Sequence, residues 1–71
     1  MDARLELTRL GRQKPFIPFR IKLSDGRSIE IDRPHMFALG LTTILIGYMA
    51  GTHDQLPLAE VVSIEELQRI G

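Results

Sequence analysis

The chain has 71 residues, of which 44% are hydrophobic and 25% are charged, and it contains no cysteine. A chain of this length forms one small domain with a thin core, and neither a disulfide nor a thiolate zinc site can reinforce that core. The formal net charge is zero, which is not the strongly basic balance typical of nucleic-acid-binding domains. We therefore expect a single globular domain over residues 1–71, apolar enough for such a small body that copies of it self-associate.

The charge is unevenly distributed along the chain. Residues 1–33 carry a net charge of +3 and residues 34–71 a net charge of −3, which would allow copies to pair head to tail. The N-terminus lacks the apolar stretch of a secretory signal, and the uncharged run over residues 36–50 is shorter than the ~20 residues of a spanning helix. These features predict a cytoplasmic protein without a membrane span.

Residues 2–11 are predicted to form a short helix. Asp2 can serve as the N-cap, Leu7 and Leu10 fall on one face, and Gly11 can take the left-handed position that ends a helix. Because so short a helix is not stable alone in water, it should dock on the sheet that follows.

Residues 16–24 and 27–33 are predicted to form the two strands of a hairpin. Apolar and polar residues alternate along both strands, which is typical of a sheet with one buried face. A two-residue turn would place apolar side chains opposite polar ones, whereas a three-residue loop with a left-handed Gly26 pairs Arg20 with Glu30. The side chains that this second register gathers on the inner face are Phe19, Ile21, Leu23, Ile29 and Ile31.

A proline ends the hairpin, and the region after it is predicted to hold a turn and a third strand. A single helical turn fits residues 34–37, and a short extended piece follows at 37–39. Residues 41–50 are β-branched, aromatic and nearly all apolar, so we expect a strand covered on both faces, by the helix or by a second subunit. Residues 51–55 are predicted to be a loop, and residues 56–60 a helical turn.

The last segment allows two interpretations. A strand over residues 60–65 is favoured, because few residues remain before the chain ends. The alternative is a helix from Ser63 to Ile70, with Glu66 completing a capping box. The elements together predict an α+β fold, in which a short N-terminal helix packs on a strongly bent antiparallel sheet of four or five strands.

The stretch over residues 15–27 reads Pro-Phe-Ile-Pro-Phe-Arg-Ile-Lys-Leu-Ser-Asp-Gly-Arg. It resembles the core of a group of short bacterial proteins of unknown function, and the likeness extends over residues 13–47 and, more loosely, 61–65. A looser likeness, at the level of the fold, is to small Sm-like and SH3-like barrels, in which an N-terminal helix precedes a bent sheet and a one-turn helix precedes the last strand. These resemblances imply a small bacterial β-barrel and no particular activity.

The sequence contains no catalytic, metal-binding or nucleotide-binding motif, so no enzyme activity and no cofactor is expected. Neither His35 nor His53 lies three or four residues from another ligand-type residue on a predicted helix. The His53-Asp54 pair can bind a metal ion or shuttle protons, and turn chemistry explains it equally well.

Two surfaces remain as candidate sites. Basic residues lie on the outward side of the predicted hairpin: Arg20, Lys22, Arg27 and Arg33. They can bind an anion or nucleic acid, or they can simply form a solvated face. Apolar candidates for an oligomer interface lie in the predicted third strand: Ile44, Ile46, Tyr48 and Met49. We therefore expect a non-enzymatic interaction module that binds itself or another protein, with a small RNA- or DNA-binding barrel as the alternative.

Overall fold

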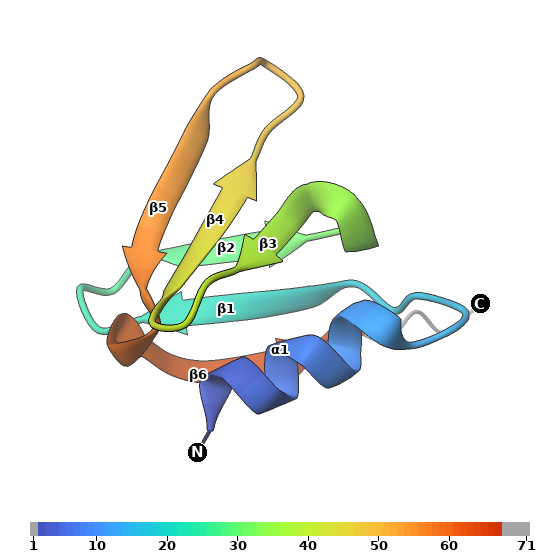
Figure 1. Cartoon of the computed structure of the whole chain (residues 1–71), viewed down its shortest axis with the longest axis horizontal. Coiled ribbons are helices and arrows are strands. Elements are labelled where there is room, and N and C mark those ends of the chain that lie inside the picture. The colour runs from blue at the N-terminus through green and yellow to red at the C-terminus, as the bar shows by residue number, and fades with distance from the viewer. Residues whose placement is uncertain (1, 68–71) are drawn as a thin grey trace.

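The computed structural model describes residues 2–67, which form one α-helix and two antiparallel three-stranded sheets (Figure 1). The first sheet has the order β2-β1-β6, and the second has the order β3-β4-β5. The bounds of the α-helix and strands are α1 Ala3–Arg12, β1 Phe19–Leu23, β2 Ser28–Ile31, β3 Phe37–Leu39, β4 Thr43–Gly47, β5 His53–Pro57 and β6 Val61–Glu66. Two short 3-10 helices connect the sheets: η1 (Pro34–Met36) leads from β2 to β3, and η2 (Leu58–Glu60) leads from β5 to β6.

The predicted N-terminal helix is confirmed as α1, and its N-cap is the predicted one. The side chain of Asp2 accepts a hydrogen bond from the backbone N–H of Leu5 at 3.1 Å. The expectation that Gly11 ends the helix is wrong, because α1 continues through it. Its missing side chain serves another purpose: a Cβ at position 11 would lie 3.1 Å from Cζ of Phe37, so glycine lets the helix approach that ring closely.

The hairpin of β1 and β2 has the predicted register. Arg20 is paired with Glu30, and Gly26 has a φ of +94°, which closes the three-residue loop. The backbone N–H of Gly26 donates to the carbonyl of Leu23 at 3.0 Å. Both strands are shorter than predicted, partly because Pro18 cannot donate a backbone hydrogen bond and so precedes β1.

The region after η1 contains more strand than predicted. The extended piece at 37–39 is confirmed as β3. The strand predicted over residues 41–50 is present as β4, but it is shorter than predicted. The loop expected at residues 51–55 is wrong, because β5 occupies most of this segment and pairs with β4 over its whole length. The helical turn at 56–60 is reduced to η2. The expected single bent sheet of four or five strands is therefore corrected to two sheets with three strands each within residues 2–67.

The favoured interpretation of the last segment is confirmed by β6, which pairs antiparallel with β1. The alternative helix beginning at Ser63 is wrong up to Leu67, and its remaining residues lie outside the described part of the chain. A register shift between Lys22 and Leu23 leaves Val62 as the extra residue of a β-bulge, and this side chain is 60% exposed.

The core is built by residues of α1 and of both sheets. Leu7 and Leu10 of α1 are fully buried, so the expectation that the helix docks is confirmed. The helix runs alongside β6 (Figure 1) and packs on β6, η1 and η2. The buried residues are Ala3, Leu7, Leu10, Phe19, Ile21, Leu23, Ile31, Ile44, Ile46, Leu56 and Val61.

Two covers were expected for the outer face of the third predicted strand, the helix or a second subunit, and the structure rules out the helix. Ile44 and Ile46 of β4 are fully buried, but Leu45 between them is 43% exposed. Since α1 packs beside the other sheet, nothing within residues 2–67 covers the outer face of β4.

Candidate functional site

The two sheets have chemically different outer faces. Alternation along β4 and the register with its neighbours place seven residues on the outer face of the β3-β4-β5 sheet. They are Ala38, Thr43, Leu45, Gly47, His53, Gln55 and Pro57. We call this set the uncharged sheet face, because it contains no Asp, Glu, Lys or Arg.

The outer face of the β2-β1-β6 sheet is instead a ladder of opposite charges. Arg20 lies between Glu30 and Glu65, and its guanidinium pairs with their carboxylates at 3.4 Å and 3.0 Å. Lys22 lies on the same face and makes no ion pair within the described residues. Charges alternating in this way are typical of a solvated sheet face.

The other two basic candidates lie beyond the ends of β2, so the structure does not gather all four into one patch. Arg27 pairs with Asp25 at 2.8 Å, and Arg33 pairs with Asp32 at 3.4 Å. The backbone N–H and the guanidinium of Arg27 hold the pKa of the Asp25 carboxyl below its ordinary value. Three of the four predicted basic residues therefore have a carboxylate partner, which weakens the positive potential offered to a polyanion.

The predicted interface residues are divided between the core and the surface. Ile44 and Ile46 are fully buried, so they present no side chain to a partner. Met49 is 83% exposed, and Tyr48 is half-buried. The interface prediction missed Leu45, although the alternation of β4 would have separated it from its two buried neighbours.

Tyr48 is held in place by a polar contact at the end of the β4-β5 hairpin. Its hydroxyl donates a hydrogen bond to Oδ2 of Asp54 at 2.9 Å. Burial raises the pKa of the Tyr48 hydroxyl, and the hydrogen bond to the Asp54 carboxylate raises it further. His53 and Asp54 are neighbours in the sequence, but they lie on opposite faces of β5. Asp54 binds Tyr48, while His53 belongs to the uncharged sheet face.

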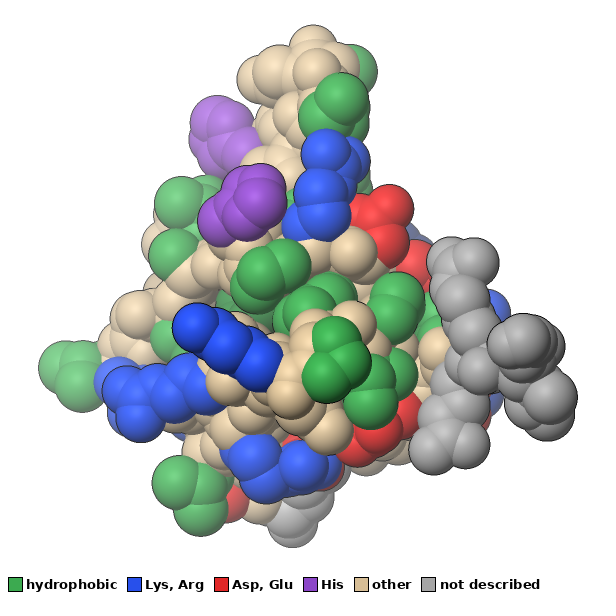
Figure 2. Space-filling view, turned by 90° about the vertical axis from the view of Figure 1, so that its right-hand side faces the viewer, with side chains coloured by type: hydrophobic (Ala, Val, Ile, Leu, Met, Phe, Trp, Pro, Cys, Tyr) green, Lys and Arg blue, Asp and Glu red, His purple; other side chains and the backbone are tan. Residues whose placement is uncertain are grey.

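A shallow hollow lies at the η1 end of the uncharged sheet face. One depression, of about 410 Å³, is lined by His35, Met36, Phe37, Ala38, Leu45, Gly47 and His53. A second depression shares His35, Met36 and Gly47 with the first and adds Met49 among its lining residues. We call the two together the Gly47 hollow. Both histidine side chains are seen beside apolar groups on the side of the molecule shown in Figure 2.

Proximity of the two histidines to one depression was not predicted from the sequence. They are far apart along the chain, and His35 comes from η1 whereas His53 comes from β5. Within residues 2–67, no group of three or more His, Cys, Asp or Glu is placed so that it could hold a metal ion.

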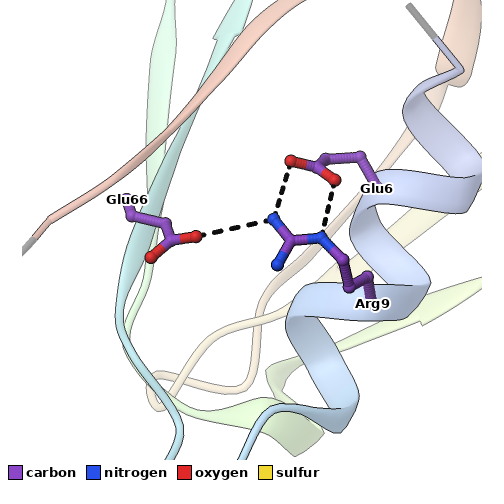
Figure 3. Close-up of polar contacts among 3 residues, drawn as sticks. All are labelled: Glu6, Arg9 and Glu66. Carbon is purple, nitrogen blue, oxygen red and sulfur yellow. Dashed lines mark hydrogen bonds and ion pairs between the residues drawn. The ribbon is translucent and has the colours of Figure 1, made fainter.

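An ion-pair cluster joins α1 to β6 elsewhere on the surface. Arg9 makes two hydrogen bonds of 2.9 Å to the Glu6 carboxylate and approaches Glu66 at 3.5 Å (Figure 3). The hydrogen bond from Arg9 lowers the pKa of the Glu6 carboxyl. Because Arg9 of α1 pairs both with Glu6 and with Glu66 of β6, this cluster is explained as a link between helix and sheet.

Comparison of this chain with protein-family models, with curated proteins and with solved structures gave no match. Among the helices in the described part of the chain, none has the length and apolar character needed to cross a membrane.

Proposed function

We propose that this chain is a non-enzymatic interaction module that self-associates through the uncharged sheet face. The observation that carries the proposal is Leu45, which is 43% exposed at the centre of a sheet face without a fixed charge. An antiparallel sheet that faces water normally carries polar and charged side chains there, as Arg20 and Glu30 do on the other sheet. The uncharged sheet face departs from that pattern, which favours a protein partner over water.

A second copy of the same chain is the partner that the charge distribution favours. In a two-fold interface each patch meets itself, so a fixed charge near the axis would face its own copy and repel it. The uncharged sheet face has no such charge. Ala38 and Gly47 are small and project little from the sheet, so another sheet can approach its backbone closely there.

The size of the face predicts a weak association. β4 and β5 have five residues each and β3 has three, so the three strands cover about 200 Å² of flat area per copy. A standard protein interface buries about 800 Å² on each partner. Contacts from neighbouring exposed residues such as Met49 would have to enlarge the interface, and we expect a dimer that dissociates on dilution.

Sedimentation of the wild-type chain and of two lysine variants tests this proposal. Leu45→Lys places a charge at the centre of the proposed interface, so we expect it to remain monomeric at concentrations where the wild type associates. Leu41→Lys is the matched control, since Leu41 is 87% exposed but precedes β4 and lies outside the uncharged sheet face. Thermal melts establish that both variants are folded. A wild-type chain that is monomeric at every concentration, or equal loss of association in both variants, contradicts the proposal.

The alternative of a small RNA- or DNA-binding barrel has less support. It relies on Arg20, Lys22, Arg27 and Arg33, and the three arginines among them already pair with carboxylates. Titration of single-stranded oligonucleotides at low salt tests it, and absence of binding there rejects it.

The relationship to known proteins, the barrel architecture and the cellular location that were expected from the sequence remain proposals. Likeness to Sm-like or SH3-like barrels is supported by the order of the elements: α1 precedes the strands, and η2 precedes the last strand. Relationship to small bacterial proteins rests on the hairpin sequence of residues 15–27 alone. In the described residues the two sheets do not join through backbone pairing into a closed barrel. A cytoplasmic location likewise stays a proposal.

A further inference from the structure

We propose that the Gly47 hollow binds a soft monovalent metal ion, Cu(I), through imidazole and thioether groups. Both histidines of the chain, and both methionines within the described residues, line the two depressions that form this hollow. His35 and Met36 come from η1, Met49 follows β4, and His53 begins β5. A single chain supplies all four groups. Gly47 and His53 also belong to the uncharged sheet face, so metal binding and self-association should compete for this surface.

Gly47 explains why these groups border open space. It is the cross-strand partner of His53, and a Cβ at position 47 would lie 4.0 Å from the carbonyl oxygen of Met36. Gly47 therefore lies between β5 and η1 and contributes no side chain to fill the gap. Its φ is not in the left-handed region, so the backbone does not require glycine at this position. Its absent side chain matters because it leaves the space open.

The type of donor group selects the class of metal. Imidazole nitrogen and thioether sulfur suit Cu(I), whereas Ca²⁺ and Mg²⁺ prefer carboxylate and carbonyl oxygen. A structural zinc site needs four ligands drawn mainly from Cys and His, and no group of three His, Cys, Asp or Glu is available within residues 2–67. The two histidines alone therefore provide too few donor groups, and the thioethers of Met36 and Met49 are needed to complete the site.

The charges near the hollow permit a monovalent cation. Arg33 lines one of the two depressions, but its guanidinium pairs with Asp32 at 3.4 Å. Asp54 accepts the hydrogen bond of Tyr48, but it lies on the opposite face of β5 from His53 and lines neither depression.

Titration with Ag(I) nitrate, a redox-stable ion with the same ligand preference, tests the site in a chloride-free buffer. Tyr48 lines the hollow and is the only tyrosine in a chain without tryptophan, so its fluorescence reports binding directly. We expect saturable quenching with one ion per chain, together with shifts of the Met36 and Met49 methyl resonances. Cu(I), kept reduced with ascorbate under argon, should compete with Ag(I) for the same site.

Three variants decide the assignment. His53→Gln and Met49→Leu each remove one donor group at an exposed position, so each should weaken Ag(I) binding about tenfold or more while the chain stays folded. Gly47→Val should fill the hollow and abolish binding. The matched control is Leu41→Met, which adds a thioether outside the hollow and should leave affinity unchanged. Non-saturating quenching, or the same affinity in wild type, His53→Gln and Met49→Leu, overturns the proposal. Sedimentation of the metal-free chain reports separately on self-association.

Discussion

The role of Gly26 is determined by its neighbours in the sequence, whereas the role of Gly11 is determined by a residue far away in the chain. Gly26 has a φ of +94°, and its turn is determined by neighbouring residues, so the sequence predicted both the loop and the register. Gly11 instead allows a close approach, because the ring of Phe37 lies 3.1 Å from where its Cβ would be. That contact joins positions far apart in the chain, so no local rule could distinguish it from a glycine that ends a helix.

The pKa of Tyr48 provides a prediction at the scale of one residue. Burial and the hydrogen bond to Asp54 raise this pKa above its ordinary value of 10.0. The neutral hydroxyl is thus favoured in the folded state. Its contribution to stability should be fully present below pH 10 and should be lost as the pH rises through the raised pKa.

Absorbance of the phenolate measures this titration without interference, because Tyr48 is the only tyrosine. We expect a midpoint above that of free tyrosine, and a lower midpoint in Asp54→Asn, which removes the negative charge. Glu60→Gln removes a carboxylate that binds Ser24 instead and serves as the control. Equal midpoints in wild type and Asp54→Asn would show that the hydrogen bond has no role in the shift.

The strands show where a local pattern is sufficient and where it is not. The alternation of β1 predicted its buried and exposed faces correctly, because apolar and polar residues alternate there without exception. β5 begins His-Asp-Gln, residues with little preference for strands, and was predicted as a loop. Pairing with β4 along its whole length stabilises β5 as a strand, and this pairing is a property of the sheet.

The docking of α1 provides a prediction at the scale of one element. Leu10 is fully buried, so Leu10→Ala should leave a cavity and reduce the free energy of unfolding by about 2–5 kcal/mol. That is a large share of the stability of so small a domain. Leu5 belongs to the same helix but is 69% exposed, so Leu5→Ala should change stability by less than about 0.5 kcal/mol.

Urea denaturation followed by circular dichroism measures both variants under identical conditions. Similar losses in Leu10→Ala and Leu5→Ala would mean that the helix does not dock through the face that carries Leu7 and Leu10.

The charge distribution of the whole molecule allows two modes of association to be distinguished. Pairing of the positive N-terminal half with the negative C-terminal half would weaken as salt screens the charges. Pairing through the uncharged sheet face should depend little on salt, since no Asp, Glu, Lys or Arg lies there.

We therefore expect the dissociation constant to change by less than about threefold between about 0.05 M and 0.5 M NaCl. Sedimentation equilibrium at the two salt concentrations measures it, with Leu45→Lys as the non-associating reference. A steep weakening with salt would indicate head-to-tail pairing of the two halves in place of the sheet-face contact.

The sequence by itself determined the α+β class, the N-cap at Asp2, the register of the first hairpin and the final strand. These features depend on residues near one another, whose propensities and spacing act before the chain is compact. Tertiary structure alone decided that the strands separate into two sheets and that one of them keeps an uncharged outer face. It also placed His35 and Met36 beside two neighbouring depressions, one lined in addition by His53 and the other by Met49. Such groupings arise only when distant segments pack together, because cross-strand pairing and packing against η1 determine which side chains become neighbours.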